Sequence, residues 1–185
     1  MGVVTETLLD DLYDAGVVFE DGLTDDELRD VERRLGIAFG TDHRDLLSRV
    51  LPVGRGWPDW LADDDELRAL LAAPVERVVS DALDDGFWPA SWGTVRGDEA
   101  VALAHLARVP VLVPVFGHRY QTAGAAAGAP VLSAYGRDVI YYGADLADYL
   151  GREFLGAVSP VPPVDGDRRV PFWSDLADGT DPIHM

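Results

Sequence analysis

The side chains best suited to chemistry follow one predicted strand and recur on a later one. An imidazole can transfer a proton near neutral pH, and a guanidinium can bind an anion through its fork of N–H donors. Because strands of one sheet bring distant residues together, these side chains could line a pocket that binds or converts a small molecule. The residues concerned are His118, Arg119, Asp138 and Tyr142, and Tyr120 is a further candidate binding residue beside them.

The same residues also have a purely structural interpretation, and the sequence favours it. A histidine often hydrogen-bonds the backbone, and an arginine that follows a turn often pairs with a nearby carboxylate such as Asp138. No nucleophile and no second base accompany His118 and Arg119 in the sequence. We therefore expect no catalytic residue and a protein that is not an enzyme, with the small-molecule pocket as the alternative.

Metal and cofactor sites lack their usual patterns. The chain has no cysteine, and His43, His105, His118 and His184 are too widely spaced for a zinc motif. The acidic run 63–66 lacks the alternating ligands of a calcium loop and is typical of a solvated helix start. No glycine-rich phosphate loop and no nucleophile elbow occurs. We expect no metal ion and no cofactor.

The charge is strongly negative and unevenly distributed. The chain has 33 acidic residues and 15 basic ones, which gives a net charge of −18, and all the basic residues are arginine. Residues 1–85 hold 22 of the acids and 8 of the arginines. Such a surface repels a phosphate backbone, so we expect no nucleic-acid partner. It could steer a basic protein, although the composition favours the simpler interpretation of a solubilising surface.

The tryptophans could serve as interface anchors or as core residues. Trp57 and Trp60 lie in a loop broken by glycine and proline, and we expect them to be more exposed than Trp88 and Trp92. Exposed tryptophans could bind a partner protein. They could instead meet across the interface of a homo-oligomer.

The predicted elements place helices first and strands later, which favours an α+β fold with a small antiparallel sheet packed against several helices. Helix starts and stops, and apolar periodicity, give the helices 5–14, 24–35, 42–51, 63–71, a segment from Pro74, 98–108 and 145–155. The strands expected are 111–116, 131–135 and 138–142. Pro114 predicts that the first strand is at an edge or bulged, since proline cannot donate to a ladder.

Residues 1–156 are expected to form one domain, and the proline-rich residues 157–185 a tail that packs on it or trails from it, with Trp173 as an anchor. No basic segment followed by an apolar core marks a signal peptide. No apolar run reaches the length of a membrane helix. We expect a cytoplasmic protein that does not associate with membranes.

Two blocks of sequence resemble the SUKH superfamily, the Smi/Knr-like proteins. The first is the capped helix 22–36, with Glu32 and Leu35-Gly36, followed by a short second helix from Asp42. The second combines Phe87-Trp88-Pro89, the run 112–120 and the run 138–143, and is similar to an uncharacterised actinobacterial branch of that group. The usual proline before the second helix is replaced by Gly40-Thr41, and the usual Asn-Gly after it by Leu51-Pro52.

The resemblance implies a small α+β domain that binds proteins rather than a catalyst. Many bacterial members of the superfamily act as immunity proteins that neutralise a toxin, often a nuclease. An acidic protein of this kind would suit a basic toxin as its partner. The sequence therefore leads to the hypothesis of a toxin-neutralising, protein-binding module.

Overall fold

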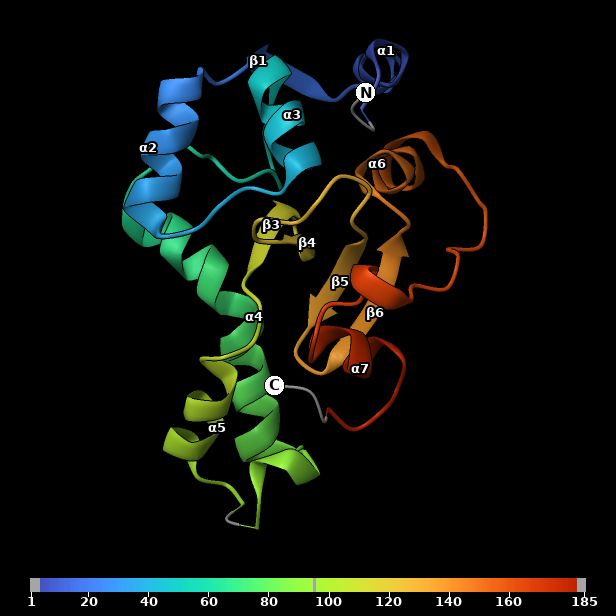
Figure 1. The fold of residues 1–185 in the computed structure, drawn as a ribbon. Coiled ribbons are helices and arrows are strands. Elements are labelled where there is room, and N and C mark those ends of the chain that lie inside the picture. The colour runs from blue at the N-terminus through green and yellow to red at the C-terminus, as the bar shows by residue number, and fades with distance from the viewer. Residues whose placement is uncertain (1–3, 95, 183–185) are drawn as a thin grey trace.

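A computed structural model of the protein describes residues 4–94 and 96–182 (Figure 1). Helices and two antiparallel sheets make up the fold, which confirms the predicted α+β class. The α-helices are α1 (Glu6–Asp14), α2 (Asp25–Leu35), α3 (Thr41–Arg49), α4 (Asp64–Asp84), α5 (Glu99–Leu106), α6 (Leu146–Leu155) and α7 (Trp173–Ala177). The strands are β1 (Val18–Asp21), β2 (Val50–Val53), β3 (Leu112–Phe116), β4 (Arg119–Thr122), β5 (Val131–Tyr135) and β6 (Asp138–Gly143), and two 3₁₀ turns are η1 (Ala90–Trp92) and η2 (Gly166–Arg168).

The start of α2 follows its sequence signals closely. The Thr24 hydroxyl accepts from the Glu27 backbone N–H, and a Glu27 carboxylate oxygen accepts from the Thr24 backbone N–H at 2.8 Å. This capping box satisfies two donors that the first turn would leave unpaired. The helix ends at Gly36, which adopts a left-handed conformation with φ +69°.

The two-stranded sheet was not predicted. β1 pairs antiparallel with β2, with Val18 opposite Val53. The helix expected to reach residue 51 ends at Arg49, and Val50 begins β2 in an extended conformation. Pro52 disfavours a helical conformation at the residue before it, and the run 50–53 is rich in β-branched side chains, so the chain turns into a strand earlier than helical periodicity indicated.

The prediction of a helix break near Pro74 was wrong. α4 is one continuous helix of 21 residues with Pro74 buried inside it. A proline in a helix removes one backbone hydrogen bond and crowds the preceding turn. Here α4 packs against α2, α5, β3 and β5 along its length, and this tertiary contact holds both halves in line.

The larger sheet has the order β3-β4-β5-β6, and every pair is antiparallel. β3 is an edge strand, and its register with β4 shifts between Pro114 and Phe116, so both alternatives offered for Pro114 are confirmed. The turn between β5 and β6 uses Gly136 at φ +61°, a value that suits glycine. β4 was not predicted as a strand, because its four residues are mostly polar.

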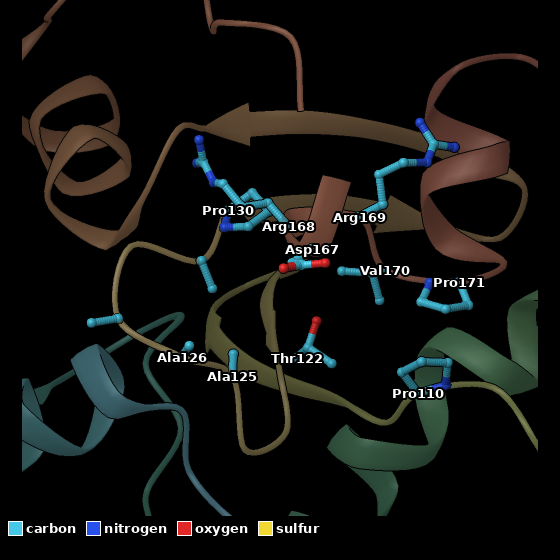
Figure 2. Close-up of a pocket in the computed structure, with 12 residues that line it drawn as sticks. Pro110, Thr122, Ala125, Ala126, Pro130, Asp167, Arg168, Arg169, Val170 and Pro171 are labelled. Atoms are coloured by element: carbon cyan, nitrogen blue, oxygen red, sulfur yellow. The ribbon is translucent and has the colours of Figure 1, made fainter. Parts of the chain in front are cut away.

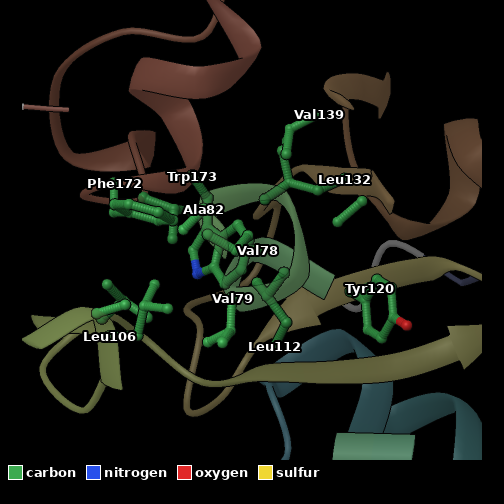
Figure 3. Packing of buried hydrophobic residues seen from close by; sticks show 14 of the residues in the cluster. Val78, Val79, Ala82, Leu106, Leu112, Tyr120, Leu132, Val139, Phe172 and Trp173 are labelled. Atoms are coloured by element: carbon green, nitrogen blue, oxygen red, sulfur yellow. The ribbon is translucent and has the colours of Figure 1, made fainter. Parts of the chain in front are cut away.

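The largest core cluster joins the sheet, α4 and the C-terminal segment (Figure 3). Phe172 and Trp173 come from that segment and are 0% and 1% exposed. The Trp173 indole donates a hydrogen bond to the Pro110 carbonyl at 2.8 Å, which confirms Trp173 as an anchor. Thus Val164, Val170 and residues 172–175 are buried, whereas the runs 155–160 and 165–168 are exposed.

Candidate functional site

Arg119 is the centre of a polar cluster between the sheet and α6. Its guanidinium lies 4.0 Å from the centre of the Tyr142 ring and donates a hydrogen bond to the Ser133 hydroxyl at 3.0 Å. Its Nε lies 3.7 Å from a carboxylate oxygen of Glu153 on α6. The side chains of Arg119 and Glu153 are largely buried. The cluster therefore fastens α6 to the sheet through a desolvated charge pair and a cation–π contact.

The predicted meeting of four polar side chains is only partly present. Arg119 and Tyr142 are in contact, but the carboxylate beside Arg119 is Glu153, so the suggested Arg119–Asp138 pair was wrong. Within residues 4–94 and 96–182, Asp138 makes no ion pair or side-chain hydrogen bond, and it is exposed. Arg119 is committed to structural contacts, because its partners come from the protein itself.

The His118 side chain lies on the face of the sheet opposite to Arg119, outside the polar cluster. Successive residues near the start of a strand point to opposite faces of a sheet, and the His118 ring contacts the Tyr135 ring with centroids 6.3 Å apart. The Arg77 guanidinium lies over the same Tyr135 ring at 4.0 Å. Partial desolvation and the positive charge of Arg119 lower the pKa of His118, which favours a neutral imidazole.

Tyr120 and Tyr149, two tyrosines near Arg119, are buried among core side chains. Tyr120 is 4% exposed and belongs to the large core cluster, and burial raises the pKa of its phenol. Tyr149 on α6 lies edge-on to Tyr142 at 5.9 Å, and burial raises its pKa as well. Both phenols therefore stay protonated at neutral pH.

The expected exposure of Trp60 was wrong. Trp60 is 1% exposed and packs edge-on against Phe39, with centroids 4.8 Å apart. Trp57 is half-buried, stacked on Phe154 at 5.3 Å. Trp88, Trp92 and Trp173 are buried too, as expected for the first two. With four of five tryptophans inside the chain's own core, a dimer interface built on exposed tryptophans loses its basis.

A surface that the sequence did not single out surrounds Leu61. Leu61 is 56% exposed, and three grooves meet at its side chain. One groove runs along β1 and the start of α2, one along the start of α4, and one beside Trp57. We call this the Leu61 surface. Its charged lining residues are Glu20, Asp21, Glu27, Arg34, Arg49, Asp59, Asp63, Asp64, Asp65 and Glu66.

The Leu61 surface is strongly negative. Both of its arginines are engaged: Arg34 pairs with Asp30 and Asp64, and Arg49 with Glu6 and Asp45. Among the residues that the structure describes, only Asp64 of its eight carboxylates has an ion pair, Glu27 is held by the capping box, and the other six have neither. These are Glu20, Asp21, Asp59, Asp63, Asp65 and Glu66. Asp63 occupies the N-cap position of α4, which starts at Asp64, so the helix start expected for 63–66 is confirmed.

The loop that carries Leu61 is held in place. The Asp59 carboxylate accepts a hydrogen bond from the Leu61 backbone N–H at 3.0 Å. Trp60 fixes the preceding position in the core. A docking surface that is already ordered loses less conformational entropy when a partner binds. The only sequence signal for this surface was an apolar residue, Leu61, between Asp59 and the acidic run 63–66. Whether Leu61 is exposed depends on whether Trp60 turns into the core, which the sequence does not show.

His43 is a buried titratable group close to this surface. It is 2% exposed, its ring lies edge-on to Phe39 and Trp60, and its Nδ1 has no hydrogen-bond partner within the described residues. Burial lowers the pKa of His43 from 6.5 to about 3. The folded state therefore excludes the proton that the unfolded chain binds near pH 6.5.

This shift predicts an acid-sensitive contribution to stability. The contribution is complete above pH 6.5 and is lost as the pH falls toward 3, since only the unfolded state then takes up the proton. When the pH is lowered from about 7 to about 5, the loss of this contribution should reduce the free energy of unfolding by about 2 kcal/mol. Urea unfolding of the wild type and of His43→Leu at both pH values measures it. Equal losses in the two proteins would contradict this assignment.

Three comparisons, with family models, curated proteins and solved structures, found no match. The SUKH resemblance therefore stays a prediction. Among the described residues, no three His, Asp or Glu side chains are grouped so that they could hold a metal ion. None of the described helices combines the length and the apolar character that a membrane crossing needs.

Proposed function

We propose that this chain is a non-enzymatic binding module whose partner is a basic protein that docks on the Leu61 surface. The observation that carries the proposal is an exposed leucine surrounded by six carboxylates without ion pairs. The SUKH resemblance adds the partner class to test first, a basic toxin such as a nuclease, which the chain would neutralise in the cytoplasm.

The arrangement matches the physical design of protein interfaces. Their binding energy is concentrated in a few central residues that are shielded from water by a polar rim. Leu61 would fill an apolar hollow on the partner, and the surrounding carboxylates would meet its lysines and arginines. Opposite charges accelerate association and orient the partners, and this attraction weakens with salt.

The alternative, a small-molecule pocket around His118, Arg119, Asp138 and Tyr142, is not favoured. The Arg119 guanidinium contacts Ser133, Glu153 and Tyr142. The His118 ring contacts Tyr135 instead of the cluster. A ligand would have to displace these contacts before it could bind the guanidinium.

Site-specific photocrosslinking in the producing cell tests the proposal. A photoreactive phenylalanine analogue replaces Leu61 in one variant and Leu103 in another, since Leu103 is 44% exposed on α5, away from the Leu61 surface. We expect position 61, and not position 103, to crosslink to one basic protein. The purified pair should then bind with an affinity that falls as salt rises. Absence of a crosslink from position 61, or equal crosslinking from both positions, would refute the proposal.

A further inference from the structure

A separate hollow lies between the C-terminal segment and the loop after β4 (Figure 2). It has a volume of about 170 Å³, which is enough for a small organic molecule. Alanine and proline side chains form most of its wall. Its lining residues are Pro110, Thr122, Ala125, Ala126, Ala127, Ala129, Pro130, Asp167, Arg168, Arg169, Val170 and Pro171.

Two polar groups face into the hollow. In Figure 2 the Asp167 carboxylate lies at its centre, and the Thr122 hydroxyl points toward it from the opposite wall. The side chains of Arg168 and Arg169 extend away to either side. Within the part of the chain that the structure describes, Asp167 has no ion pair. The hollow therefore offers one unpaired, solvent-exposed carboxylate and one half-buried hydroxyl beside its apolar walls.

The two arginines are occupied elsewhere. Arg169 pairs with Asp175 at 3.0 Å and with Asp178, whose carboxylate raises the pKa of Arg169. The Arg168 guanidinium donates to the Ala144 carbonyl. Asp167 and the two partners of Arg169 thus outnumber the guanidiniums, and the whole chain carries a charge of −18. The overall charge of the chain, and the position of the Asp167 carboxylate at the centre of the hollow, favour a cation over an anion.

Both walls are fixed before any ligand binds. The alanine loop is attached to the start of α3 by three hydrogen bonds: Gly124 N–H to the Ala38 carbonyl, Thr41 N–H to the Ala125 carbonyl, and Gly128 N–H to the Asp42 carboxylate. Their lengths are 2.8, 2.8 and 2.6 Å. The opposite wall is held where the Val170 N–H donates to the Ser174 hydroxyl at 2.7 Å. Preformed walls reduce the entropy cost of binding.

We propose that this hollow binds a small aliphatic ammonium compound. The ammonium group would donate hydrogen bonds to the Asp167 carboxylate and the Thr122 hydroxyl, while the hydrocarbon part would lie against the alanine and proline wall. A carboxylic acid of the same length would be repelled by Asp167. A neutral alcohol would lose the charge-assisted hydrogen bond. This site is independent of the Leu61 surface.

Amide NMR titration with n-butylammonium chloride tests the site, with sodium butyrate and 1-butanol as matched probes at constant ionic strength. We expect saturable shifts at the amides of Ala125, Ala126 and Val170 with the amine alone. Asp167→Asn should weaken binding at least about tenfold, the size expected for a lost charge-assisted hydrogen bond. Asp165→Asn, which removes an exposed carboxylate outside the hollow, should leave it unchanged.

A second variant separates the hollow from general charge attraction. Ala126→Phe fills the hollow and leaves every carboxylate in place, so it should abolish the shifts, and an otherwise unchanged spectrum shows that the variant is folded. Comparable shifts with butyrate or butanol would overturn the proposal. So would an unchanged affinity in Asp167→Asn, or in a folded Ala126→Phe.

Discussion

Replacing Trp60 with alanine is expected to reduce the free energy of unfolding by about 3–5 kcal/mol. Trp60 is 1% exposed and belongs to the cluster that joins α2, α3, α4 and β2 with Val113 of β3. Its ring lies edge-on to Phe39 and His43. Alanine would remove this apolar area and leave a cavity where five elements meet. Guanidinium unfolding followed by circular dichroism measures the loss.

Two further variants serve as controls for the Trp60→Ala result. Trp60→Phe keeps an aromatic ring in the cluster and should cost clearly less. Trp57→Ala removes a half-buried ring that packs on Phe116 and Phe154, and it should also cost less than Trp60→Ala. A loss below about 1 kcal/mol for Trp60→Ala would show that this residue is not in the core.

Leu61→Arg is expected to weaken the affinity for the crosslinked basic partner by about a hundredfold or more. The substitution removes the apolar residue at the centre of the surface, which the proposal makes a hot spot, and truncation of a hot-spot residue costs about 2 kcal/mol or more. It also places a positive charge against a positive partner. Because the side chain is exposed, the stability of the free protein should barely change. Calorimetric titration of the purified pair at constant salt measures the affinity.

The control for charge is Leu103→Arg, which adds the same group to an exposed position on α5. It should leave the affinity within about twofold, since a distant charge is screened by salt. If both variants weaken binding equally, net charge alone governs the interaction and the Leu61 surface has no specific role.

Local sequence signals predicted those elements that local physics determines. Thr24 and Glu27 marked the start of α2 because a capping box satisfies its own backbone donors. Pro114 marked an edge strand because it cannot donate to a ladder. In contrast, β4 and the continuity of α4 through Pro74 depend on neighbours from distant parts of the chain. Tertiary contacts override propensity at these positions.

The candidate sites show the same division. His118 and Arg119 were recognisable as polar residues at a strand, but the identity of Glu153 as the partner of Arg119 required the packing of α6 on the sheet. Trp57 and Trp60 lie in one loop with similar surroundings in sequence, yet Trp60 turns inward and Leu61 outward. Loop residues have no periodicity from which their direction can be deduced, so the Leu61 surface could not be found from the sequence.

The packing of residues 170–173 against α4 affects how the protein folds during its synthesis. Val170, Phe172 and Trp173 complete the same core as Val78 and Val79 of α4, almost a hundred residues earlier. During synthesis the apolar face of α4 leaves the ribosome long before the segment that covers it. Exposed apolar surface of this kind attracts chaperones and invites aggregation. This half of the molecule can therefore fold only after residues 170–173 have left the ribosome, and shortening the chain before Val170 should yield a product that is degraded rather than folded.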